Sequence, residues 1–162
     1  MRESPSHSSY PTGLHEATAY VAALREPLER AFEARRRWTG EVRRLVERAA
    51  AGDLDGVLAA AGPIGEEYGS AFSRCRVRLL ALTAPPVCAA LHASAVGWFD
   101  ELVLACRVLQ DAAGTGELDR MLDANTHLVA AAQQARLFNA EYEILSAGLR
   151  SAGPSPLQPA ST

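Results

Sequence analysis

The four histidines are the first residues in this chain that could do chemistry, because imidazole binds metals and transfers protons near neutral pH. A carboxylate-bridged dimetal site in a helical bundle uses Glu-x-x-His pairs from two helices. The chain has no such pair, because the residues three positions before its histidines are Ser4, Thr12, Ala89 and Ala124. We therefore expect no metal site and no cofactor.

His92 is the histidine with the most apolar surroundings, since only small or apolar residues lie one helical turn away on either side. Its imidazole could face an interior ligand, or it could be a structural group bonded to a polar neighbour. Two asparagines flank an apolar face of the last helix, where Asn either fixes helix pairing or lines a pocket. An interior ligand site would combine His92, Trp98, Asn125, Asn139 and Tyr142.

Arginine supplies all 16 basic residues, and no Lys is present. Residues 25–48 hold eight Arg against five Glu, a net charge of +3. That charge is modest for nucleic-acid binding, in which several neutralised phosphates supply the affinity. Nucleic acid is therefore not an expected partner. The alternative to ion pairing on the helix surface is an anion site at Arg36, Arg37, Arg43 and Arg44.

Cysteines stand at positions 75, 88 and 106, an odd number without a Cys-x-x-Cys motif. All three fall in apolar helical patterns, so we expect buried, reduced thiols and a cytoplasmic location. The most apolar stretch is interrupted by Asp100 and Glu101, and we expect no membrane span. The Ala and Arg bias is typical of a GC-rich bacterial genome.

Helical periodicity runs through almost the whole chain, with apolar residues spaced alternately three and four apart. The pattern predicts helices over about 14–51, 54–82, 86–113 and 117–150. Pro27 and Gly62-Pro63 fall inside the first two helices and predict kinks, or a split of the second helix. The third helix is apolar nearly all round, so it should be central or covered by a partner.

A near-copy at a spacing of 64 residues relates the two halves of the chain. Residues 45–58 recur as 109–122, and each copy has a helix end, a Gly break and an acidic helix start. Two tandem helical hairpins therefore predict an all-α, antiparallel four-helix bundle. We expect one domain over 13–150 between disordered segments at 1–12 and 151–162.

No residue pattern assigns a reaction, so the leading hypothesis is a non-enzymatic helical interaction module that self-associates or binds a partner protein. The long first helix is expected to overhang, leaving Leu14, Val21 and Leu24 for a second chain to cover. The first alternative is a bundle that binds a small molecule near His92. The second is an Arg-mediated nucleic-acid or anion binder.

Overall fold

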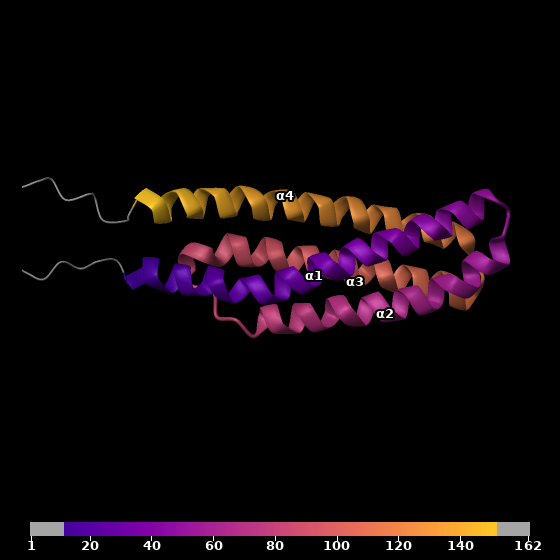
Figure 1. Ribbon diagram of the computed structural model, residues 1–162, viewed down its shortest axis with the longest axis horizontal. Helices are drawn as coiled ribbons and strands as arrows, with labels where there is room; N and C mark the ends of the chain where they lie inside the picture. The colour runs from indigo at the N-terminus through magenta and orange to yellow at the C-terminus, as the bar shows by residue number, and fades with distance from the viewer. Residues whose placement is uncertain (1–11, 152–162) are drawn as a thin grey trace, which may run out of the picture.

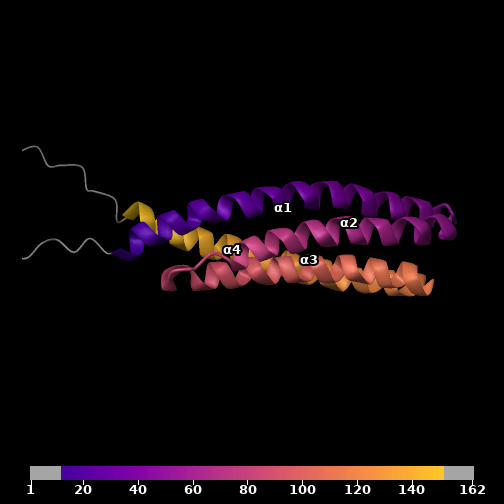
Figure 2. The ribbon, with the colours of Figure 1, turned by 90° about the horizontal axis from the view of Figure 1, so that it is seen from below.

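The computed structural model describes residues 12–151 and confirms an all-α, four-helix bundle. Sequential helices run in opposite directions along one long axis (Figures 1 and 2). Among the described residues there is no β-strand. The elements, in chain order, are α1 (Thr12–Ala50), α2 (Leu54–Leu80), the 3₁₀ turn η1 (Pro86–Cys88), α3 (Ala89–Thr115), the 3₁₀ turn η2 (Leu118–Arg120) and α4 (Met121–Ser151).

The ends of the described chain lie in helices, since α1 begins at Thr12 and α4 ends at Ser151. The rest of the two segments predicted to be disordered, 1–11 and 152–162, lies outside the described residues. The single helical domain predicted for 13–150 therefore covers nearly all of the described chain.

The two hinges that the repeat predicts share a glycine but differ in how the next helix starts. Gly52 and Gly116 both have positive φ, +80° and +72°, a conformation that favours glycine at the end of a helix. Asp53 then caps α2 by accepting a hydrogen bond from the backbone N–H of Gly56 at 3.0 Å. At the second hinge, Glu117 makes no capping bond and η2 precedes α4.

Prolines inside a helix and prolines between helices have different effects in this chain. Pro27 and Pro63 each lie within one continuous helix, so the split considered for the second helix does not occur. The predicted bends at these prolines stay predictions. The Pro85-Pro86 pair does interrupt the helical conformation between α2 and α3. Pro85 is extended, with ψ 154°, and α3 follows η1.

Helix α3 is the centre of the bundle, as its all-round apolar sequence predicts. It packs extensively against α2 and α4, while α1 packs mainly against α2. Ten residues of α3 are buried, but only three of α4, and that contrast identifies α3 as the central helix. The largest core side chains include Trp38, Phe72 and Phe99. Trp38 of α1 meets Phe72 of α2 edge to face, with ring centroids 5.9 Å apart.

The start of α1 is covered by its own chain, so the expected apolar overhang is wrong. Leu24 is buried, and Val21 packs partly buried against the core. Leu14 borders a groove with Leu145 and Leu149 of α4. The C-terminal end of α4 therefore reaches the region where the lengths of the first and third helices suggested a gap.

One segment, Pro86–Thr115, is long and apolar enough to cross a membrane by length and composition. It comprises η1 and α3, and a central core helix passes the same test. In the structure, this segment packs between α2 and α4.

A close contact between α2 and α3 generates a stability prediction at Gly65. A Cβ atom there would lie 2.5 Å from the backbone carbonyl oxygen of Cys106, so the helices would have to separate. We expect Gly65→Ala to lower the free energy of unfolding by about 1–3 kcal/mol in urea titrations. The control is Gly40→Ala in α1, where the added Cβ meets nothing within 4 Å. It should instead stabilise by about 0.5–1 kcal/mol. Equal effects of the two substitutions would contradict the close contact.

Candidate functional site

His92 is part of a hydrogen bond between two helices. Its Nδ1 lies 2.6 Å from the Tyr20 hydroxyl, which joins α3 to α1. Burial, with a smaller contribution from Cys88, raises the pKa of Tyr20 to about 12, so the hydroxyl keeps its proton at neutral pH. His92 itself is only partly buried. This geometry matches the structural role considered for His92, that of an imidazole bonded to a neighbouring polar side chain.

The five residues predicted to form an interior ligand site do not lie together. Trp98 is buried between Phe32 and Phe99, with ring centroids 5.2 and 5.0 Å away. Asn139 and Tyr142 are exposed on α4. Asn125 alone lines a sizeable cavity, at the end of the bundle away from His92. The structure therefore separates the members of the predicted site and points to a different one.

His127 forms a second contact between helices, which the sequence did not reveal. Its Nδ1 lies 2.7 Å from the Glu101 carboxylate on α3, and both side chains are about a quarter exposed. The apolar spacing along this helix does not include His127, so it gives no sign of the contact with Glu101. The contact lies on the side of α4 that meets α3, and the opposite face of α4 points outward.

The basic residues of α1 are paired largely with neighbouring carboxylates. In the predicted anion site, Arg37 pairs with Glu33 and Arg44 with Glu41, while Arg36 and Arg43 are exposed on the same helix. Short-range pairs of this kind belong to an ordinary solvated helix surface.

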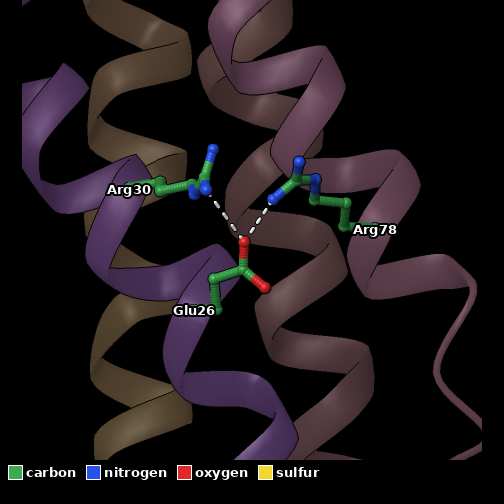
Figure 3. Close-up of polar contacts among 3 residues, drawn as sticks. All are labelled: Glu26, Arg30 and Arg78. Carbon is green, nitrogen blue, oxygen red and sulfur yellow. Dashed lines mark hydrogen bonds and ion pairs between the residues drawn. The ribbon is translucent and has the colours of Figure 1, made fainter.

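A groove of about 370 Å³ between α1 and α2 brings arginines from both helices together. Glu26 contacts Arg30 of its own helix, at 3.1 Å, and Arg78 of α2 (Figure 3). The groove walls also carry glutamates. Because carboxylates neutralise much of this charge, the groove gives little support to an anion site. Its arginines are Arg30, Arg37, Arg74 and Arg78.

A more apolar cavity lies between α1 and α4, close to the two hinges. This α1–α4 cavity has a volume of about 420 Å³. Its walls join a small separate cluster, which includes Leu45 and Val57, to the main core at Leu109. Trp38 also borders it, and Trp38 Nε1 is a buried N–H without a hydrogen-bond partner among the described residues. Polar groups enter the lining only at Asp119 and Asn125.

Helix α4 has a second apolar face on the side away from α3. Four large apolar side chains on this face are half to three-quarters exposed: Leu122 (73%), Val129 (52%), Leu137 (54%) and Ile144 (69%). Thr126, Gln133 and Ala140 complete the row, and all three are uncharged and exposed. The α4 outer stripe consists of Leu122, Thr126, Val129, Gln133, Leu137, Ala140 and Ile144.

The spacing of the α4 outer stripe is 4-3-4-4-3-4, which places all seven residues on one face of the helix. No charged residue interrupts this row from Leu122 to Ile144. Scattered apolar residues are normal on a surface, but a continuous uncharged row is not. The sequence contains this signal. Apolar spacing gives this helix two apolar faces, and spacing alone does not decide which of the two is buried.

Metal ligands do not cluster in the described part of the chain. Across residues 12–151, no three His, Cys, Asp or Glu side chains gather where they could hold an ion. The three cysteines are free and buried.

Comparison with known proteins identifies no relative. The chain matches no protein-family model, and no curated protein or solved structure matches it at significance.

Burial of the three thiols predicts slow chemical labelling of the native protein. Burial raises the pKa of Cys75, Cys88 and Cys106, the last to about 12. Because the thiolate is the nucleophile, we expect iodoacetamide to modify Cys106 at about pH 8 at least a hundredfold more slowly than in denaturant. Mass spectrometry of timed samples measures this. Rapid labelling of Cys106 in the folded protein would show that the α2–α3 contact opens.

Proposed function

We propose that this protein is a non-enzymatic helical module that self-associates, and that the α4 outer stripe is its interface. One observation carries the proposal: four large apolar side chains stay exposed on the face of α4 opposite the core. Burying them against another helix removes apolar surface from water, which is the main driving force of association.

A second copy of the same chain is the occupant that fits this surface. The spacing of three and four is that of packed helices, so the matching surface is a helix with the same spacing. Helix α4 itself supplies such a row, without a charge that would have to be buried. The reduced thiols fit a reducing compartment such as the cytoplasm, and the proposal includes that location.

Two matched substitutions test the interface. Val129 on the stripe and Val77 on α2 are both exposed helical valines, at 52% and 64%. We expect the wild-type protein to be at least dimeric by light scattering at micromolar concentration. Val129→Glu should weaken association at least about tenfold, because each interface would bury two added carboxylates. Val77→Glu should leave the mass unchanged.

Two results would contradict the self-association proposal. The first is a monomeric wild-type protein at about 100 μM, far above the concentrations at which stable helical dimers form. The second is dissociation by Val77→Glu but not by Val129→Glu, which would place the interface on α2. Circular dichroism of each variant separates lost association from lost folding.

The α1–α4 cavity supports a second candidate function, the binding of a small apolar molecule. Its volume of about 420 Å³ falls within the range of ligand pockets, and its lining is mostly apolar. Asn125 belonged to the ligand site suggested by the sequence, whereas His92 lies elsewhere. Trp38 Nε1 is covered, so a ligand would reach that donor only if a side chain shifted. The mostly apolar lining of the cavity is therefore the observation that supports small-molecule binding.

A neutral fluorescent probe, N-phenyl-1-naphthylamine, tests the cavity. We expect saturable binding that Val46→Phe reduces at least about fivefold, since Val46 lies on the exposed edge of the cavity and a larger side chain would fill it. Val77→Phe is the control and should not change binding. Loss of binding on Val129→Glu instead would show that the probe occupies the α4 outer stripe.

A further inference from the structure

We infer that two copies pair through their α4 outer stripes in antiparallel directions, with Gln133 of each copy on the two-fold axis. This inference rests on the proposed self-association and adds the direction and register of the pair. It follows from a symmetry in the order of the stripe residues.

The α4 outer stripe reads the same way from both ends. Its spacing, 4-3-4-4-3-4, is a palindrome centred on Gln133. The residue classes follow the same symmetry, because large apolar residues alternate with small or uncharged polar ones. The pairs equidistant from the centre are Leu122 with Ile144, Val129 with Leu137, and Thr126 with Ala140.

In an antiparallel pair of α4 helices, the symmetric positions of the two stripes come to lie opposite each other. A two-fold interface is self-complementary, so residue i of one copy meets residue j of the other and j meets i. With Gln133 on the axis, each Leu122 faces Ile144 of the second copy, and each Val129 faces Leu137 of the second copy. All eight large side chains are then covered at once. The one long polar side chain of the row, Gln133, meets its own copy, and the two amides can hydrogen-bond.

The distances at the axis are suitable for a direct chemical test. Packed helices have axes about 8–10 Å apart, and Cα atoms lie about 2.3 Å from each axis. The two Gln133 Cα atoms would therefore be about 3.4–5.4 Å apart, and the upper part of this range is one that a disulfide spans. The two copies of Leu122 would instead be about 33 Å apart, at 1.5 Å per residue.

The edges of the stripe contain one unfavourable pairing in this register. Asp123 and Glu141 lie on the same edge, next to the interface. In the antiparallel pair, Asp123 of one copy would lie near Glu141 of the second, and two carboxylates would repel. On the other edge, Arg136 of one copy and Arg136 of the second copy would be about 9 Å apart along the helix axis. This distance is close to the screening length in salt, so their repulsion is weak. A change of charge at Asp123 therefore tests whether the two α4 helices run antiparallel or parallel.

Cysteine cross-linking tests the register. The native thiols are buried, so an added surface cysteine is the reactive one. Under mild oxidation we expect Gln133→Cys to form a covalent dimer in high yield. Leu122→Cys alone should not form one, whereas an equal mixture of Leu122→Cys and Ile144→Cys should. Glu47→Cys, on an exposed position of α1, measures cross-linking by random collision.

Each other outcome contradicts a definite part of the inference. Efficient cross-linking of Leu122→Cys to itself would show a parallel pair. A dimeric protein in which no stripe cysteine cross-links above the Glu47→Cys rate would overturn the register and place the interface elsewhere. A monomeric wild-type protein would overturn the proposed function itself, and light scattering before oxidation distinguishes that failure.

A charge substitution tests the direction without a cross-link. In the antiparallel pair, Asp123→Arg replaces two repulsive contacts with two attractive ones to Glu141 of the second copy. We expect the dimer to strengthen severalfold at low salt and the gain to shrink as salt is added. In a parallel pair, position 123 would face the region of Asn125, and the affinity would not rise. Asp111→Arg, exposed on α3, is the control.

Discussion

The close packing of α3 between α2 and α4 is the constraint on which the rest of the bundle depends. Helix α3 is apolar on most of its surface, so two neighbouring helices are needed to bury it. The chain meets this need with small residues. Gly65 lets α2 approach the backbone of α3, and Ala124 and Ala131 are buried on the face of α4 that meets it. Short distances between helix axes give good packing where individual side chains bury little area.

The use of small residues at the contact between α3 and α4 affects the surface of α4. Ala124 and Ala131 let the helices approach closely, and Leu145 is the one large side chain that α4 buries fully beside them. Four other large apolar residues of α4 face outward: Leu122, Val129, Leu137 and Ile144. The His127–Glu101 contact is compatible only with this rotation, because turning α4 would separate the two side chains. The protein gains a closely packed core and leaves apolar surface unburied on α4.

The hinges were the part of the fold that the sequence predicted best. Gly52 and Gly116 adopt the left-handed conformation that helix-ending glycines favour, and Asp53 caps α2 as its position suggests. These features depend on a few adjacent residues, so local sequence determines them. Helix ends differ from the prediction by a few residues where η1 and η2 occupy a first turn. A 3₁₀ turn and an α-helical turn have the same apolar spacing over three residues, so the pattern cannot separate them.

The candidate site was predicted less well, because it depends on contacts between helices distant in sequence. Periodicity shows that a helix has an apolar face, but α4 has two, and only packing decides which one meets α3. His92 looked like a ligand residue because its neighbours in sequence are apolar, yet its partner is Tyr20, 72 positions away. Trp38 and Leu109 come to the same cavity from different hairpins for the same reason.

The two hairpins differ in the kind of surface that they expose. In the first, Arg and Glu pair along α1 and across to α2, so its polar surface is largely satisfied by its own side chains. In the second, the α4 outer stripe carries no charge, and its end residues Leu122 and Ile144 border grooves that α1 also lines. A duplicated hairpin could lose the charges of one copy without unfolding, since α3 and α4 keep their own contact. The two copies therefore differ in where apolar surface is left exposed, and the proposed dimer uses the symmetry of that surface on α4.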